Sequence, residues 1–245
     1  LVIAEDTRHS RRLLDHYHIA TPLSSYHEHN EAKETPRLVA RLLSGDSIAL
    51  ISDAGTPLIS DPGSRLVTAA LDAGIPVVPI PGASSVLAAL VGSGMSLEKF
   101  TFLGFLPRKG RERSEMIADV VASQSTVVLF EAGNRVGATL DALADAGAGD
   151  RPAVVARELT KQFEEFKRGT VAELAGVYSD TDPRGEIVLV IAGAAKPQVT
   201  ESELSEAARK LRDSGNSPRD VMDHLVSSLG APRNLAYKIA HESEP

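Results

Sequence analysis

The chain contains no cysteine and no tryptophan, and aromatic residues make up only 4% of its 245 positions. Without cysteine there is no disulfide bond, no thiolate nucleophile and no cysteine-ligated metal. This composition suits a reducing compartment, so we expect a cytoplasmic protein. No apolar run reaches the roughly 18 residues that a membrane-spanning helix needs, so we expect no membrane partner.

An excess of positive charge is also missing, because 33 acidic residues outnumber 26 lysines and arginines and leave a net charge of −7. Such a chain is a poor candidate for nonspecific binding to nucleic acid, which depends on neutralising phosphates. Two short basic clusters run against this trend: "TRHSRR", from Thr7 to Arg12, and "PRKGRER", from Pro107 to Arg113. Most charge runs are solvated faces, so the clusters alone only permit a phosphate-binding role.

Strand and helix patterns alternate over the first hundred residues, which predicts a parallel sheet with crossover helices. The opening "LVIAE" has no methionine and reads as the end of a strand, so we expect further residues upstream. Asp6 or Thr7 is expected to cap the first helix. Strands are expected at 1–5, 47–52 and 75–82, and helices at 6–19, 35–45, 64–74 and 83–94.

A second α/β unit follows, and a helical segment ends the chain. Helices are expected at 113–123 and 135–147, strands at 126–132, 152–160 and 185–193, and a mixed segment at 162–174. Residues 194–200 read as a linker, and 201–242 as about three short helices broken at "SGNSP" and "LGAPRN". We therefore expect an N-terminal α/β domain at 1–102, a second α/β domain at 103–196 and a helical module at 200–245.

A glycine-rich turn that is itself acidic, "ISDAGTPLISDPGSR", joins the strand at 47–52 to the next helix. A carboxylate opposes a phosphate by about 4 kcal/mol at 4 Å in a surface-like dielectric, so a triphosphate is disfavoured. Asp53, at the strand end, can instead accept hydrogen bonds from ribose hydroxyls or an amine and tolerates a cationic ligand. Asp61 is expected to cap the turn and the following helix, and an ordinary turn is the alternative for both residues.

Two further motifs are less specific. In "PIPGASS", Ser84 and Ser85 can cap a helix or bond a ligand, and an ordinary strand-to-helix turn is the simpler interpretation. In "HEHNE", His27 and His29 would share a face only on an extended strand and have no obvious third ligand. We therefore expect no metal site there, but a solvated or partner-facing loop.

Taken together, the motifs resemble one family. They are "AEDTRHSRRLL", "SYHEHNE", "ALISDAGTPLISDPGSRLV", "PVVPIPGASSVLAAL", "FTFLGFLPRKGRER", "LFEAGNRV" and "ARELTKQFEEFKRGTVAEL", in this order. The set is similar to the ribosomal RNA small subunit methyltransferase I family. That family belongs to the tetrapyrrole methylase superfamily, the class III S-adenosylmethionine (SAM) methyltransferases. The resemblance covers essentially the whole chain.

The resemblance implies an α/β fold of two α/β domains with a SAM cleft between them, plus a C-terminal helical module that engages RNA. It implies SAM-dependent 2′-O-methylation of a cytidine ribose in the decoding region of small-subunit ribosomal RNA. The expected partners are this RNA or the ribosomal subunit, and a second copy of the chain in a homodimer. The family begins with a strand and a Pro-x-Gly-Asn-Leu turn, which we expect to be missing ahead of "AEDTR".

The resemblance also implies site residues. The cofactor-binding set is Ile51, Ser52, Asp53, Thr56, Pro57, Ile59, Ser84, Ser85, Phe130, Glu131, Ala132, Leu159, Glu186 and Ile187. Independently of the resemblance, Asp6 is the candidate general base because it lies at a predicted strand end, with proton loss to water as the alternative. Arg8 and Lys161 are candidates for orienting a phosphate. The RNA-binding candidates are Arg11, Arg12, Arg108, Lys109, Arg111 and Arg113.

Two other functions stay open. One is a methylase of the same fold that acts on a tetrapyrrole or another small acceptor, and the other is a noncatalytic RNA-binding factor of ribosome assembly. The basic clusters and the helical tail favour RNA over a porphyrin as the partner. A porphyrin would also need a larger apolar cleft than this aromatic-poor sequence indicates.

Overall fold

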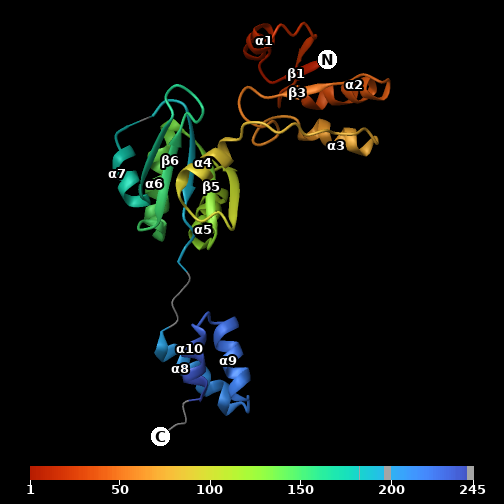
Figure 1. Cartoon of the computed structure of the whole chain (residues 1–245). Coiled ribbons are helices and arrows are strands. Elements are labelled where there is room, and N and C mark those ends of the chain that lie inside the picture. Colours follow the sequence, from red (N-terminus) through yellow and green to blue (C-terminus); the bar gives the residue numbers. More distant parts are fainter. Residues whose placement is uncertain (182, 196–199, 242–245) are drawn as a thin grey trace. The chain divides into compact units, whose positions relative to one another are not determined.

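The computed structural model describes residues 1–181, 183–195 and 200–241, and the chain divides into two compact units, Leu1–Ala194 and Ala195–Pro245 (Figure 1). None of the helices in these described parts combines the length and the apolar character that crossing a bilayer requires.

A small parallel sheet opens the first unit. Its strands are β1 (Val2–Ala4), β2 (Leu23–Ser25) and β3 (Ala49–Ile51), in the order β2-β1-β3. The helices α1 (Thr7–His16), α2 (Glu31–Leu43) and α3 (Ser64–Asp72) belong to the same region. Their core comprises Ile3, Tyr26, Leu38 and Leu66, and the Tyr26 hydroxyl is satisfied by Thr35 at 2.8 Å. The predicted parallel sheet is confirmed, although β2 was not foreseen.

The predicted strand at 75–82 is wrong, because the structure has no strand there. The segment "IPVVPIPG" carries three prolines, and a proline has no backbone N–H to donate to a sheet ladder. Its apolar side chains stay in contact with solvent, with Val78 and Ile80 exposed by 73% and 82%.

A larger mixed sheet follows. Its strands are β4 (Phe100–Phe105), β5 (Thr126–Ala132), β8 (Glu186–Ile191), β6 (Pro152–Arg157) and β7 (Glu165–Thr170), in that spatial order. Only the β4–β5 pair is parallel, and the other pairs are antiparallel. Strand β4 spans residues 102 and 103, between which the boundary of the two α/β domains was predicted. The place of that boundary stays a prediction.

Successive side chains of a strand point to opposite faces of the sheet, and buried side chains occur on both faces here. Helices therefore cover both faces. Val128 and Val188 pack with α4 (Ser85–Ser93) on one face. Leu129 and Leu189 pack on the other face with α5 (Arg111–Ala122), α6 (Val136–Leu143) and α7 (Val171–Tyr178). Short 3₁₀ and π turns, Gly133–Arg135 and Ala144–Ala148, flank α6.

The second unit is helical in the part 200–241. It comprises α8 (Glu201–Asp213), α9 (Pro218–Ser227) and α10 (Arg233–His241) around a core of Leu204, Val221, Leu225 and Ile239. Capping boxes begin the first two helices at Thr200 and Ser217. The three predicted helices and both predicted breaks are confirmed.

Candidate functional site

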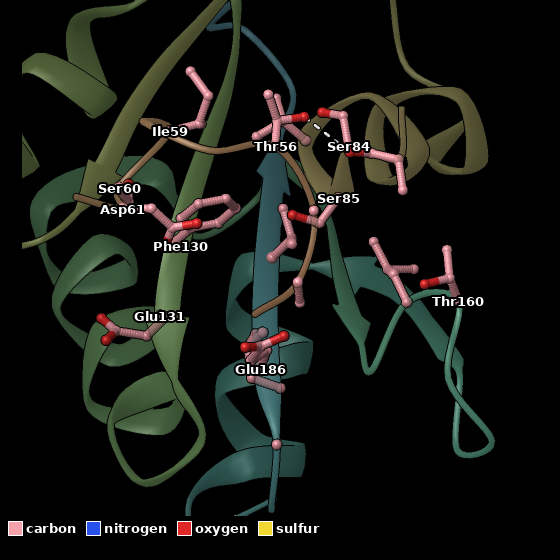
Figure 2. A pocket seen from close by; sticks show the side chains of 18 of the residues that line it. Thr56, Ile59, Ser60, Asp61, Ser84, Ser85, Phe130, Glu131, Thr160 and Glu186 are labelled. Carbon is pink, nitrogen blue, oxygen red and sulfur yellow. Dashed lines mark hydrogen bonds between the residues drawn. The ribbon is translucent and has the colours of Figure 1, made fainter. Parts of the chain in front are cut away.

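A cavity of about 360 Å³ lies in the first unit, where several loops and strand ends converge (Figure 2). Its lining comes from the loop 54–61 after β3, the turn 83–86 at the start of α4, the end of β5 at 130–133, the turn 159–161 after β6, and the start of β8 at 185–188. Phe105 of β4 completes the wall. A volume of this size suits a small-molecule ligand.

The loop after β3 is held in an unusual backbone conformation. Leu58 and Ser60 have φ angles of 71° and 65°, in the left-handed region that side chains other than glycine seldom adopt. The Thr56 hydroxyl donates to the Ala83 carbonyl at 2.8 Å and joins this loop to the turn before α4 (Figure 2). Backbone strain of this kind persists where surrounding contacts enforce it, which occurs most often at functional sites.

Aromatic and aliphatic side chains form one wall of the cavity. The ring centroid of Phe130 lies 4.8 Å from that of Phe102 and 5.4 Å from that of Phe105. Leu159 and Val188 continue this wall. An apolar surface of this size can receive a flat heterocyclic ring.

Hydroxyl groups line the cavity beside the apolar wall. Thr56, Ser84, Ser85 and Thr160 all belong to the lining and are labelled in Figure 2. Ser84 caps α4, because its hydroxyl accepts the Leu87 backbone N–H at 3.4 Å. The prediction that this serine can cap a helix is therefore confirmed, while its contact with a ligand stays a prediction.

Asp61 lies in the lining of the cavity and is not a helix cap. The predicted capping role is wrong, since the residue at the start of α3 is Gly63 and no side chain caps that helix. Burial raises the pKa of Asp61 to about 6, together with the negative charges of Glu5, Glu186 and Asp53.

An ion-pair cluster stands at another edge of the cavity. The Lys161 ammonium donates to Glu158 at 3.1 Å and to Glu186 at 2.9 Å. Burial opposes its charge, but the hydrogen bonds to Glu186 and Glu158 outweigh it and raise the pKa of Lys161. Gly185, with a φ of 99°, gives Glu158 room, because a Cβ there would collide with the Glu158 side chain.

Glu131 lines the cavity, but its carboxylate is bound by other groups of the protein. This carboxylate is buried and accepts hydrogen bonds from the Thr139 hydroxyl at 2.6 Å and the Ala132 N–H at 2.9 Å. Arg135 pairs with it at 3.0 Å, and Arg113 donates to Thr139 at 3.2 Å. These contacts favour an internal role for the Glu131 and Arg113 side chains over contact with cofactor and RNA.

A second, open depression lies beside the first sheet. It is lined by Glu5, Asp6, Thr7, Arg8, Ser25, His27, Glu28, His29 and Asp53. Asp6 caps α1 as predicted, accepting from the Arg8 backbone N–H at 2.8 Å, and its other oxygen accepts from the Arg8 guanidinium at 2.8 Å. These hydrogen bonds from Arg8 hold the pKa of Asp6 far below its usual range.

The predicted site residues thus fall into three groups. Those that line the cavity are Thr56, Ile59, Ser84, Ser85, Phe130, Glu131, Ala132, Leu159, Lys161, Glu186 and Ile187. Asp53, Asp6 and Arg8 line the depression, and Ile51, Ser52 and Pro57 line neither. Ser60, Asp61, Phe105 and Thr160 also line the cavity and were not expected from the sequence as ligand contacts. The second Ser-Asp pair was the available signal for Asp61.

The basic candidates differ in their surroundings. Arg12, Arg108 and Lys109 are exposed, and Arg111 is paired with Glu115 at 2.5 Å. Arg11 lies 4.0 Å from Asp15 on α1. Within residues 1–181, 183–195 and 200–241, no group of three histidine or acidic side chains could hold a metal ion.

Comparison with known proteins identifies the family. Residues 1–175 match the profile of the tetrapyrrole (corrin/porphyrin) methylases. Proteins named ribosomal RNA small subunit methyltransferase I from Synechocystis, Mesorhizobium japonicum and Bacillus subtilis are 42%, 49% and 44% identical to this chain. These alignments cover 100%, 94% and 98% of this chain and 88%, 73% and 84% of those proteins.

Solved structures share the fold. A cobalt precorrin-4 methyltransferase of cobalamin biosynthesis has a TM-score of 0.57 at 18% identity, over 78% of this chain and 82% of that one. A uroporphyrin-III C-methyltransferase from Thermus thermophilus, complexed with S-adenosylhomocysteine, has a TM-score of 0.50 at 18% identity, over 78% and 96%. The profile match and the identities to the curated relatives show that the chain belongs to the tetrapyrrole methylase family, among the ribosomal RNA small subunit methyltransferases I.

Proposed function

We propose that this chain transfers a methyl group from SAM to the 2′-oxygen of a cytidine ribose in small-subunit ribosomal RNA. The observation that carries the proposal is the similarity, over nearly the whole chain, to proteins named as methyltransferases of that RNA. An enzyme of the same fold is known in complex with S-adenosylhomocysteine, the demethylated form of SAM, which supports a ligand of this class. A substrate of this kind implies action in the cytoplasm.

The cavity fits the chemical groups of SAM. Phe130, Leu159 and Val188 offer an apolar wall that would take the adenine ring. The hydroxyls of Ser84, Ser85 and Thr160 can exchange hydrogen bonds with ribose and carboxylate oxygens. Asp61 adds negative charge, which suits a ligand that carries an ammonium and a sulfonium group.

The reaction needs alignment more than covalent help from the protein. SAM supplies an electrophilic methyl carbon: its bond to sulfur breaks while a bond to the ribose 2′-oxygen forms, and the hydroxyl proton leaves. Holding the two reactants in line can contribute up to about 7–11 kcal/mol. The residues of this chain therefore bind, orient and exclude water.

Asp6 is the candidate base, but its contacts support a different role. Both carboxylate oxygens are engaged by Arg8, one of them also as the cap of α1. A carboxylate with a strongly lowered pKa is a weak proton acceptor. We therefore propose that Asp6 positions the exposed Arg8 guanidinium for a substrate phosphate, and that the proton leaves to water.

Exposed basic groups would hold the RNA. Arg8, Arg12, Arg108 and Lys109 have solvent-facing side chains that can neutralise phosphates. Lys161 stands at the edge of the cavity, where it can approach a phosphate beside the target ribose. Arg113 is the weakest member of this proposed set, because it is held by Pro107 and Thr139.

The helical unit would add an RNA contact. In α10, the exposed ring of Tyr237 stacks on His241 with centroids 4.2 Å apart. Aromatic faces of this kind can stack on unpaired bases. A photocrosslinker at position 237 of the full chain should yield an adduct with small-subunit RNA, and an adduct confined to protein would argue against this contact.

A homodimer would cover apolar surface that the first unit exposes. Val78, Ile80, Leu87 and Val91 are exposed by 73%, 82%, 55% and 75%, and they lie in one stretch of sequence around the start of α4. An apolar patch formed by such neighbouring side chains is typical of a protein interface. A second copy of the chain is the occupant that we propose for this surface.

Binding of SAM is the direct check on the cofactor. A ligand that binds only the native state raises the melting temperature by mass action. We expect both SAM and S-adenosylhomocysteine to raise it, and labelled methyl groups from SAM to enter small-subunit RNA. If neither response occurs, the protein is a noncatalytic RNA-binding factor. If it methylates a tetrapyrrole in place of RNA, it is a methylase of the same fold with a small acceptor.

A further inference from the structure

The charges around the cavity do not balance at Asp61. The charged groups that act most strongly on its carboxylate are negative: Glu5 follows β1, Asp53 follows β3, and Glu186 begins β8. The cation in the lining, Lys161, is held by Glu158 and Glu186. Among the residues that the structure describes, no lysine, arginine or histidine forms an ion pair with Asp61.

The fold nevertheless holds Asp61 in the lining. The preceding residue, Ser60, has a φ of 65°, and the Thr56 hydroxyl ties the same loop to the Ala83 carbonyl at 2.8 Å. The side chain is half-buried, so water screens its charge incompletely. In the ligand-free protein, burial and three neighbouring carboxylates make the ionised form of Asp61 unfavourable. Arrangements of this kind are characteristic of binding sites.

We propose that Asp61 is the counter-charge of the cavity, which forms an ion pair with a cationic group of SAM. The proposal rests on the proposed function, because it takes SAM as the ligand. The cationic group is either the ammonium of the methionine part or the sulfonium, since both carry the positive charge that the carboxylate lacks. Asp61 thereby selects cationic ligands over neutral ones of similar shape.

Proton release follows from this assignment. With a pKa of about 6, Asp61 is about half protonated in the free protein at pH 6. A bound cation favours the charged carboxylate, so binding at pH 6 should release up to about 0.5 proton per site. Because Asp61 loses its proton over this range, the affinity for SAM should rise from pH 5 to pH 7. The other charged groups around the site are Glu5, Asp53, Glu186 and Lys161.

The test compares Asp61→Asn with Asp72→Asn, which removes an exposed carboxylate at the end of α3, outside the lining. Calorimetry at pH 6 and pH 7.5 would measure SAM, S-adenosylhomocysteine and 5′-methylthioadenosine, which lacks the amino-acid part and has no charge. We expect Asp61→Asn to weaken SAM binding about tenfold or more at pH 7.5 and to leave 5′-methylthioadenosine within about twofold. In Asp61→Asn, the proton release on SAM binding at pH 6 should disappear. It is obtained by calorimetry in buffers of different ionisation enthalpy. Asp72→Asn should match the wild type throughout.

The ligands also separate the two cationic groups. An equal loss for SAM and S-adenosylhomocysteine assigns the ammonium, and a larger loss for SAM assigns the sulfonium. Unchanged SAM affinity in Asp61→Asn, or an equal loss for all three ligands, overturns the proposal. A wild-type protein that binds no SAM contradicts the proposed function itself. Misfolding is excluded by the melting temperature without ligand, which should not fall at pH 7.5, because the substitution removes repulsion between carboxylates.

Discussion

Two aspartates of the first unit show how surroundings set the role of one residue type. The Arg8 guanidinium and the N-terminus of α1 lower the pKa of Asp6, whereas burial, together with neighbouring carboxylates, raises the pKa of Asp61. From the sequence, Asp6 was expected both as a helix cap and as the candidate base, and Asp61 as a cap; the structure confirms only the cap at Asp6. Only the folded arrangement brings Glu5 and Glu186 toward Asp61, so the sequence could not predict that charge balance.

The Asp6→Asn variant tests the role of Asp6. Asparagine also caps helices well, so the fold should persist, but the ion pair with Arg8 is lost. We expect single-turnover methyl transfer to slow by about tenfold or less, since loss of a general base costs about 10²–10⁴-fold. Affinity for SAM should stay unchanged. A fall of a thousandfold in the single-turnover rate, with intact SAM affinity, would restore Asp6 as the base.

Among the elements, those with a strong local pattern were predictable. The β5 strand has the bounds expected from "TVVLFEA", and the three helices of 200–241 follow capping boxes and glycine breaks that the sequence displays. The segment 75–82 was predicted wrongly, because its apolar residues between two helices suggested a strand while its prolines prevent one.

The candidate site was predictable where it depends on turns, and less so where it depends on strand faces. Thr56, Ser84 and Ser85 were expected from glycine-rich turns and lie in the lining. Phe130 and Glu131 were expected together, yet successive strand residues point to opposite faces. Phe130 packs on the α4 side, while the Glu131 carboxylate is held by Thr139 of α6.

The turn before α5 offers a prediction at the scale of an element. Arg108 and Lys109 are exposed there, whereas Arg113 points inward to Thr139. The double variant Arg108→Glu/Lys109→Glu should weaken binding to small-subunit RNA and lower the slope of log affinity against log salt by about two, since each lost phosphate contact removes close to one unit.

The control for this variant is charge reversal at Glu112 and Glu115, the acidic residues at the start of α5, which should not lower the salt slope. The measurement is a filter-binding titration at several salt concentrations. Weaker binding with an unchanged slope would mean that Arg108 and Lys109 make no phosphate contact.

For the whole molecule, the chain provides a cavity-bearing unit and a helical unit in one polypeptide. The cavity accounts for the small-molecule half of the proposed reaction, while the exposed cations and α10 account for the RNA half. The acidic net charge of −7 is compatible with this, because a few exposed cations suffice for local phosphate contacts.

The apolar surface around Ile80 supplies a prediction about assembly. Ile80→Asp places a charge in the proposed dimer interface and should shift the protein from dimer to monomer in light scattering. Val177→Asp, at an exposed position of α7, is the matched control and should leave the mass unchanged. A wild-type protein that is monomeric at micromolar concentration would refute the homodimer.

The central claim is methylation of a ribose in small-subunit ribosomal RNA, and mapping 2′-O-methyl groups in that RNA tests it most directly. RNA from cells that lack this protein should be compared with RNA from the same cells after its return. The account predicts one cytidine in the decoding region whose 2′-O-methyl group disappears without the protein and returns with it. An identical methylation map in both samples would contradict the account.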